Sequence, residues 1–338
     1  MESLIGKTLD ELTAVVRSLG MKDFVARQIA DWIYQKRVGS IDGMTNLSLA
    51  HRKQLQAHYQ LGKCAFSLQQ QSTDGTVKYL FPVSNGGQIE CVMIPDKERI
   101  TLCVSSQVGC KMNCLFCMTG KQGFSGQLPA GDILNQILSV PESERLTNIV
   151  FMGMGEPLDN VSELFKVLEI LTAGYGFAWS PKRITVSTIG VLPGLRRFLA
   201  ERQEHLAISL HSPYPDERLS LMPIEKAYPI AEILQEIRKY DFSHQRRVSF
   251  EYILFGGIND DRRHAEALCR LLKDIPCRVN LIKYHALPGV DLPPTDAEAM
   301  VPFRDYLTEK GITCTIRASR GEDILAACGL LSTRAAKR

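Results

Sequence analysis

Strand-like and helix-like segments alternate from about residue 98 onwards, and this alternation restricts the possible folds more than any other feature. Short apolar runs such as 148–152 and 247–254 are each followed by a longer stretch with helical periodicity. This spacing predicts a parallel sheet with right-handed crossovers. Six such units fit a full or partial (β/α) barrel, whose chemistry lies at the C-terminal ends of its strands. The expected strands are 100–105, 148–152, 183–188, 206–210, 247–254, 277–283 and 312–317, and the expected helices are 129–140, 161–173, 193–202, 228–240, 260–273 and 297–310.

The first 97 residues follow other patterns. Residues 1–60 are predicted to be helical, with Thr8 and Glu11 forming a capping box for the first helix and Asn46 capping the third. Residues 61–97 contain short β-like runs separated by glycine-containing turns, which is typical of a small meander. We therefore expect an α/β protein with a helical accessory domain (1–60), a β-meander connector (61–97), a partial (β/α)6 TIM-like barrel (98–330) and a disordered tail (331–338).

Three cysteines lie on one short loop directly after the first expected barrel strand: Cys110, Cys114 and Cys117. The N-terminus has no secretory signal, and clustered cysteines in a reducing compartment are better interpreted as metal ligands or catalytic thiols than as disulfides. Three thiolates can hold three irons of a four-iron cluster and leave the fourth iron open to a small molecule, whereas electron-carrier clusters need four cysteines. A structural zinc site is the alternative, but it needs a fourth Cys or His, and no second pair lies nearby.

This CxxxCxxC pattern, with Phe116 before its last cysteine, resembles the radical S-adenosylmethionine superfamily. The resemblance implies one [4Fe–4S] cluster per chain and cleavage of S-adenosylmethionine to a radical. Gly155 and Glu156 follow the second expected strand, where close backbone approach and a carboxylate can receive the ammonium group of the methionine moiety. Polar groups at the ends of the third and fourth strands are candidates for binding its carboxylate or ribose, with ordinary strand-end capping as the alternative: Ser187, Ser209, Leu210 and His211.

Six longer stretches narrow the resemblance: Thr101–Cys117, Phe151–Leu158, Ser187–Gly190, Ser209–Pro213, Leu221–Ile224 and Ile316–Leu330. Together they are similar to the RlmN/Cfr family of RNA adenine methyltransferases, and the similarity runs from about residue 90 to residue 330. It also implies a radical SAM fold preceded by a helical N-terminal domain.

The resemblance implies roles for three further residues. Carbon 2 of adenine is electron-poor and cannot attack the methyl group of S-adenosylmethionine, so a radical route is required. Cys328 matches the cysteine that is methylated by one S-adenosylmethionine, and a second one yields the radical that removes hydrogen from the S-methyl group. Cys103 matches the cysteine that helps release the product and forms a disulfide with the methyl carrier, and Glu90 matches a proton acceptor. For each lone cysteine, a buried apolar role is the alternative.

Two positions bear on the branch of the family. Pro157 after Glu156 resembles the RlmN branch, which methylates carbon 2, whereas the Cfr branch methylates carbon 8, confers antibiotic resistance and typically has Ala there. His285 takes the position of an S-adenosylmethionine-contacting Asn, and Lys283 replaces a rigid Pro. We expect His285 to keep the contact through a hydrogen bond. The carbon-8 reaction remains the alternative.

The family implies RNA substrates: an adenosine in the peptidyl-transferase centre of 23S rRNA and, in some members, the adenosine 3′ of the tRNA anticodon. The target base must be splayed or flipped out of its stack. A net charge of +3 neither demands nor excludes such a partner, so local basic residues must provide backbone affinity. The candidates, for which a solvated helix face is the alternative, are Lys22, Arg27, Lys36, Arg37, Arg52 and Lys53, followed by Arg317, Arg320 and the Arg334–Arg338 tail.

No apolar run approaches the length of about 18 residues that a membrane span requires. We expect a cytoplasmic monomer that receives electrons from a donor such as flavodoxin. Two further classes remain open: a radical enzyme that acts on a small molecule or a protein, and a non-enzymatic iron–sulfur or zinc module.

Overall fold

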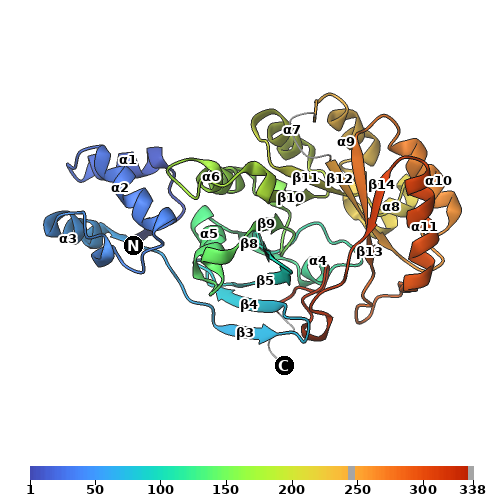
Figure 1. Cartoon of the computed structure of the whole chain (residues 1–338), viewed down its shortest axis with the longest axis horizontal. Helices are drawn as coiled ribbons and strands as arrows, with labels where there is room; N and C mark the ends of the chain where they lie inside the picture. Colours follow the sequence, from blue (N-terminus) through green and yellow to red (C-terminus); the bar gives the residue numbers. More distant parts are fainter. Residues whose placement is uncertain (243–247, 334–338) are drawn as a thin grey trace.

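The structure is a computed structural model that describes residues 1–242 and 248–333 (Figure 1). Its centre is a ten-stranded sheet, of which seven strands run parallel to their neighbours. The parallel strands lie side by side in chain order and agree with the predicted ranges to within two residues. They are β6 (Arg99–Cys103), β9 (Asn148–Phe151), β10 (Ile184–Thr188), β11 (His205–Ser209), β12 (Val248–Leu254), β13 (Cys277–Lys283) and β14 (Thr313–Ile316).

Six helices connect these strands and confirm the predicted alternation. In the second of them, every residue at the apolar positions 164, 167, 168 and 171 is buried, because this stripe faces the sheet. Burying each such side chain contributes about 1.5–3 kcal/mol. The helices are α5 (Ala130–Ser139), α6 (Val161–Thr172), α7 (Leu192–Glu201), α9 (Ile230–Ile237), α10 (Arg262–Leu271) and α11 (Ala297–Glu309).

The sheet continues beyond β6 into three antiparallel strands, β5 (Gln88–Asp96), β4 (Val77–Pro82) and β3 (Leu68–Gln71). The predicted meander is therefore part of the barrel sheet and not a separate layer. Within the described residues, β14 and β3 are the two edges of this sheet, so the barrel is open, as predicted for a partial barrel.

Several short elements around the cysteine loop were not predicted. They are the hairpin of β7 (Gln107–Gly109) with β8 (Phe124–Gln127), and the helices α4 (Met118–Gln122) and α8 (Pro215–Leu221). Each is too short to show a clear apolar period, which explains why none of them was predicted.

The N-terminal helices form one end of an elongated molecule, and α10 and α11 lie at the other (Figure 1). The capping box of Thr8 and Glu11 begins α1 (Leu9–Ser18), as predicted. A second helix, α2 (Phe24–Ala30), continues into a π-helical turn. The predicted cap of α3 (Leu49–His58) was wrong, because Ser48 Oγ accepts from the His51 amide while Asn46 accepts from the Trp32 indole instead. A parallel pair, β1 (Glu2–Ser3) with β2 (Tyr59–Gln60), joins the two ends of this segment.

After β14 the chain returns to the meander. Asp323 accepts hydrogen bonds from Ser72 Oγ and the Thr73 amide at 2.6 and 3.1 Å. Leu331 and Ser332 are buried, so the prediction that disorder begins at residue 331 was wrong for residues 331–333. The rest of that predicted tail, residues 334–338, lies outside the described residues.

Candidate active site

The C-terminal ends of the parallel strands open into a cavity of about 160 Å³. This is the end at which barrel enzymes carry their chemistry. The cavity gathers most of the predicted site from five different segments of the chain. Its lining includes Cys110, Cys114, Cys117, Gly155, Glu156, Ser187, Ser209, His211 and Cys328.

The β7–β8 hairpin and the barrel ends hold the cysteine loop from two sides. The Cys110 amide donates to the Gly123 carbonyl at 3.1 Å, where the hairpin closes. Phe116 is buried and packs edge-on against the His211 ring, with the ring centroids 4.7 Å apart. The aromatic residue of the motif therefore anchors the loop to the end of β11, which directs the cysteine side chains toward the cavity.

The chemistry of the three thiols fits an iron–sulfur cluster. Burial raises the pKa of Cys110 to about 12 and that of Cys114 well above its usual range, so without a cation these thiols stay protonated. A cluster of iron ions supplies the positive charge that favours the thiolates.

Gly155 and Glu156 form the part of the cavity wall that follows β9. Gly155 has φ +103°, and a Cβ there would lie 2.6 Å from the side chain of Gln107, so only glycine fits. The Glu156 carboxylate accepts from the Thr188 hydroxyl at 2.5 Å and from the amides of Leu158 and Ile189, each at 3.0 Å. Burial raises the pKa of Glu156 to about 7.

The polar groups at the end of β11 differ in their positions. Ser209 and His211 line the cavity, but Leu210 does not. The Leu210 side chain is buried, its amide donates to the Glu251 carbonyl and its carbonyl accepts from Arg218. His211 Nδ1 accepts from the Ile253 amide at 3.0 Å, and burial lowers its pKa to about 3, so the ring is neutral. His211 can therefore offer only its Nε2 to a ligand.

His285 lies outside this cavity lining. Its Nε2 is 2.5 Å from Ser319 Oγ, and its Nδ1 is 3.8 Å from the Glu322 carboxylate. Both ring nitrogens therefore face groups of the C-terminal segment. The structure does not bring His285 to the site where we expected an S-adenosylmethionine contact.

Cys328 and Cys103 come close from opposite ends of the chain. Cys328 lines the cavity and reaches solvent through it, while Cys103 is buried at the end of β6. Burial raises the pKa of Cys103 to about 12, and a charge on Cys328 raises it further, so the two sulfurs lie within electrostatic range. Two cysteines 225 residues apart in the sequence are thus brought near each other, although only Cys328 lines the cavity.

Glu90 is not part of the cavity lining. Its carboxylate is 1% exposed and lies 3.1 Å from the Lys78 ammonium. Burial raises the pKa of Glu90, whereas Lys78 and the amide of Ser332 oppose this shift. Glu90 therefore lies behind the segment that carries Cys328.

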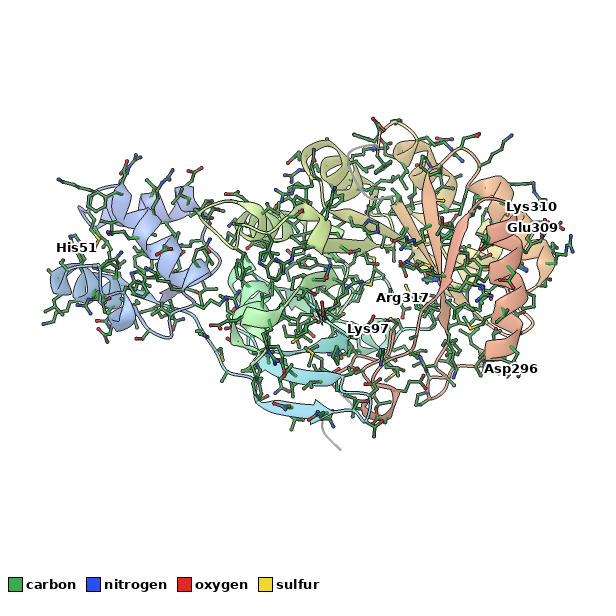
Figure 2. The ribbon with its side chains drawn as sticks, in the orientation of Figure 1. His51, Lys97, Asp296, Glu309, Lys310 and Arg317 are labelled. Atoms are coloured by element: carbon green, nitrogen blue, oxygen red, sulfur yellow. The ribbon has the colours of Figure 1, made fainter. Side chains whose placement is uncertain are left out.

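Arg317 and Glu251 also line the cavity, a role that was not predicted for either residue. Arg317 Nη1 lies 3.2 Å from Glu251 Oε2, and Figure 2 shows Arg317 in the middle of the molecule, whereas Lys310 lies at its outer end. Arg317 thus faces the cavity instead of an RNA-binding surface. Glu251 could have been found from the sequence, because it is a charged residue within an otherwise apolar strand. It occupies one of the alternating positions whose side chains face the barrel interior.

Several basic residues proposed for RNA binding are engaged within the protein. Arg37 donates to Ser143 Oγ at 3.0 Å, and its guanidinium stacks on Phe177. Arg52 donates to the Asp42 carbonyl at 2.6 Å, and Lys36 pairs with Asp31 at 2.8 Å. These contacts stabilise the N-terminal segment.

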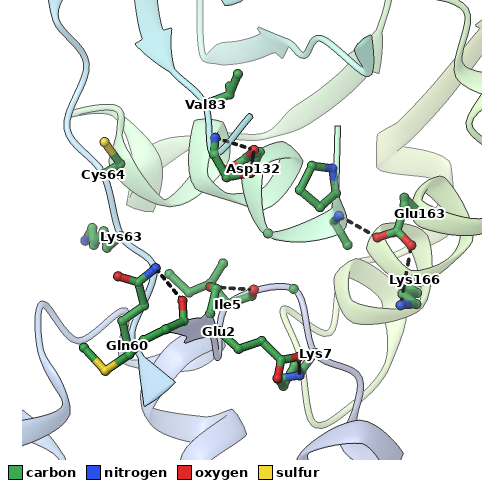
Figure 3. Close-up of a pocket in the computed structure, with 18 of the residues that line it drawn as sticks. Glu2, Ile5, Lys7, Gln60, Lys63, Cys64, Val83, Asp132, Glu163 and Lys166 are labelled. Carbon is green, nitrogen blue, oxygen red and sulfur yellow. Dashed lines mark hydrogen bonds and ion pairs between the residues drawn. The ribbon is translucent and has the colours of Figure 1, made fainter. Parts of the chain in front are cut away.

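A larger cavity of about 620 Å³ lies between the N-terminal segment and the barrel (Figure 3). Lys7 pairs with Glu2, and Lys166 pairs with Glu163 at 3.5 Å, so its wall has charges of both signs. This cavity shares no lining residue with the cysteine cavity. Among the described residues, no helix is both long and apolar enough to cross a bilayer.

Comparisons with known proteins agree with this geometry. The family model for the radical SAM superfamily matches residues 104–268, and the model for the ribosomal RNA large subunit methyltransferase N-terminal domain matches residues 3–61. A probable dual-specificity RNA methyltransferase RlmN from Parabacteroides distasonis is 63% identical over 98% of this chain and 96% of its own length. The dual-specificity RNA methyltransferase RlmN of Syntrophus aciditrophicus is 42% identical over 97% and 95%, respectively.

The fold has a crystallographic counterpart as well. The crystal structure of a radical SAM methyltransferase from Sphaerobacter thermophilus superimposes with a TM-score of 0.92 at 39% identity, and the match covers 98% of this chain and 99% of that one. The chain belongs to the RlmN family of radical SAM methyltransferases, which implies S-adenosylmethionine and a [4Fe–4S] cluster as its cofactors.

Proposed function

We propose that this protein methylates carbon 2 of adenine in RNA. The first substrate is an adenosine in the peptidyl-transferase centre of 23S rRNA, and the adenosine 3′ of the tRNA anticodon is the second. One observation carries the proposal: Cys328 lines the same cavity as Cys110, Cys114 and Cys117. A radical enzyme acting on a small molecule has no use for such a methyl-carrying thiol. The similar proteins from Parabacteroides and Syntrophus are named dual-specificity RNA methyltransferases, which supports action on two kinds of RNA target.

The cavity residues divide into two groups with different tasks. When bound to the three loop cysteines, one [4Fe–4S] cluster per chain would supply the electron that splits S-adenosylmethionine. Gly155, Glu156, Ser187, Ser209 and His211 would orient that molecule through its amino, carboxylate and hydroxyl groups. Glu156 and His211 are buried, and this part of the lining excludes water that could quench a radical.

Cys328 would act first as a nucleophile and then as a carrier. Its thiolate takes the methyl group of one S-adenosylmethionine, with S-adenosylhomocysteine as the leaving group. The S-methyl group then loses a hydrogen atom to the fragment of a second S-adenosylmethionine, so one turnover consumes two. The resulting methylene radical would add to carbon 2 of adenine and join the protein covalently to the RNA, and this adduct would return one electron to the cluster held by the three loop cysteines, so that the later steps proceed with paired electrons.

Cys103 and Glu90 would complete the reaction. Glu90 accepts the proton that leaves carbon 2. The Cys103 thiolate attacks the Cys328 sulfur, the sulfur–carbon bond breaks, and its electron pair passes to the methylene carbon, which takes up a proton to become the methyl group. A Cys103–Cys328 disulfide remains and must be reduced by two electrons before the next turnover.

We infer a cytoplasmic monomer that draws electrons from a donor such as flavodoxin. Methylation of carbon 8 is the competing reaction, and Pro157 after Glu156 favours carbon 2.

Nucleoside analysis tests the proposal directly. rRNA and tRNA from a strain lacking this protein should contain no 2-methyladenosine. Complementation with the wild type should restore it, and complementation with Cys328→Ala should not. Recovery of 8-methyladenosine would instead establish the competing reaction, and full restoration by Cys328→Ala would contradict the carrier mechanism.

A further inference from the structure

A lysine and a glutamate form a buried ion pair next to the cavity. Lys78 lies on β4 opposite Val92, and Glu90 lies on β5 opposite Leu80, so the two side chains are diagonal neighbours on one face of the antiparallel pair. The distance from Lys78 Nζ to Glu90 Oε1 is 3.1 Å, and the side chains are 7% and 1% exposed. Burying two charges is costly, and removing one partner leaves the other uncompensated.

The Lys78–Glu90 pair also makes hydrogen bonds to the segment that carries Cys328, both before and after this cysteine in the chain. Lys78 Nζ donates to the Leu325 carbonyl at 3.4 Å, three residues before Cys328. The Ser332 amide, four residues after it, donates to Glu90 Oε2 at 2.9 Å. One oxygen of Glu90 is therefore bound by the lysine, and the other by the carrier segment.

We propose that Lys78 is a positioning residue for Glu90, which fixes the buried carboxylate beneath the Cys328 segment so that its second oxygen can take the proton from carbon 2 of the bound adenine. This inference rests on the proposed function. The electron pair of the broken C–H bond stays on the adenine ring, and the proton goes to Oε2. Because Ser332 occupies Oε2 in this structure, its hydrogen bond must open first, and the Lys78–Oε1 contact then keeps the carboxylate in place.

The surroundings of Glu90 explain why a cation is needed there. Burial is the largest influence on Glu90 and raises its pKa, and Lys78 is the first of the groups that lower it, followed by the Ser332 amide. Cys91, the next residue on β5, is fully buried with its pKa well above the usual range, so it stays a neutral thiol. Without Lys78, the pKa of the carboxyl would rise further, so a smaller fraction of Glu90 would be ionised and able to accept a proton.

The test separates the charge of Lys78 from its hydrogen bonds. Lys78→Gln retains hydrogen-bond donors without the charge, and Lys78→Arg retains the charge. Lys166→Met is the control, since it breaks a partly exposed ion pair with Glu11 at 2.8 Å outside this site. Each cluster-loaded protein is assayed with an RNA substrate for S-methylation of Cys328, release of 5′-deoxyadenosine, the covalent protein–RNA adduct and 2-methyladenosine, over a range of pH.

We expect Lys78→Gln to methylate Cys328 and release 5′-deoxyadenosine within about twofold of the wild type, since neither step needs a base at Glu90. Its 2-methyladenosine formation at neutral pH should fall at least about tenfold, in keeping with the loss of a general base. The acid limb of its pH–rate profile should move to higher pH, so that raising the pH restores activity. Lys78→Arg should recover most of the rate, and Lys166→Met should match the wild type.

Two results would overturn the inference. One is an unchanged rate and pH profile in Lys78→Gln. The other is an equal loss of Cys328 methylation and RNA methylation in both Lys78 variants, which would mean that Lys78 only anchors the segment. A wild-type protein that forms no 2-methyladenosine would instead refute the proposed function itself.

Discussion

Glu156 Oε1 lies 2.5 Å from Thr188 Oγ1, and this contact joins the loop after β9 to the end of β10. Amides from both neighbouring segments complete the shell around the same carboxylate. The orientation of Glu156 is therefore set by the protein before any ligand arrives. Because burial raises its pKa to about 7, the carboxyl is protonated for about half of the time at neutral pH.

This pKa predicts how S-adenosylmethionine binding depends on pH. A donor amino group of the ligand favours the ionised carboxylate, so binding must expel the proton that Glu156 holds below about pH 7. We expect the affinity of the cluster-loaded wild type to rise up to about tenfold per pH unit below that value and to level off above it.

The Glu156→Gln variant isolates this contribution, since the ligand's own amino group titrates equally in both proteins. Equilibrium dialysis with labelled S-adenosylmethionine measures the difference. Thr188→Val removes a hydrogen bond that lowers the pKa of Glu156, so its affinity curve should move to higher pH. Identical pH dependence in the wild type and Glu156→Gln would show that Glu156 does not receive the amino group.

A glycine in the hairpin before the cysteine loop should control cluster retention. Gly109 has φ +75°, and a Cβ there would lie 1.7 Å from the Gly123 carbonyl, the same oxygen that accepts from the Cys110 amide. Gly109→Ala must therefore open the hairpin and displace Cys110.

We expect Gly109→Ala to retain several-fold less iron per chain after anaerobic reconstitution, with circular dichroism unchanged because the barrel core is untouched. Gly39→Ala is the matched control, since no atom lies within 4 Å of its Cβ position. Wild-type iron content in Gly109→Ala would show that the hairpin does not position the loop.

The barrel could be predicted from the sequence because its signal is local. β12, for example, is buried at every position, and its sequence is an apolar run interrupted only by Ser249 and Glu251. The cysteine loop was equally visible, because its three thiols lie within eight residues. Apolar strands and closely spaced cysteines can be recognised because they depend only on residues that are adjacent in the sequence.

Contacts between distant segments could not be predicted in this way. Arg317 and Glu251 are 66 residues apart, and their meeting depends on the register of β12 with β13 and of β13 with β14. From the sequence alone, Arg317 was a candidate for a surface residue that contacts RNA. Likewise, Ser319 Oγ forms a hydrogen bond with His285. Ser319 lies in a segment without helical or strand periodicity, so its partner could not be predicted from the sequence.

Arg317 should influence the first methyl transfer. The surrounding protein raises the pKa of Cys328, and Arg317 opposes this shift. Removing the cation should raise the pKa of Cys328 further, and only the thiolate attacks the methyl group. We expect Arg317→Met to methylate Cys328 about tenfold more slowly at neutral pH, which corresponds to a shift of about one pKa unit. Raising the pH should restore the rate.

A time course of intact-protein mass spectrometry with S-adenosylmethionine measures this rate. Arg317→Lys retains the positive charge beside Glu251 and should be close to the wild type. Arg320→Met is the control, since Arg320 lies three residues further along and faces Asp96 at 3.9 Å instead of the cavity. A pH-independent defect in Arg317→Met would indicate that Arg317 acts on the fold and not on the thiol.

Replacing Cys328 and replacing Cys103 should block the reaction at different steps. Cys328→Ala lacks the methyl carrier, so it should form neither 2-methyladenosine nor a covalent adduct with RNA, while still cleaving S-adenosylmethionine. Cys103→Ala can still load and transfer the methylene group but cannot break the sulfur–carbon bond, so the protein–RNA adduct should accumulate to nearly one per chain. Cys64→Ala, which replaces an exposed cysteine outside the cavity, should behave as the wild type.

The release step should also depend on pH in the wild type. Burial raises the pKa of Cys103 to about 12, so only a small fraction is ionised at neutral pH, and this fraction grows about tenfold per pH unit. In a single turnover without added thiol, adduct decay should accelerate as the pH rises and should leave a Cys103–Cys328 disulfide detectable by peptide mass spectrometry. If adduct decay in Cys103→Ala matches the wild type at every pH, another nucleophile releases the product, and the proximity of these two thiols has no catalytic meaning.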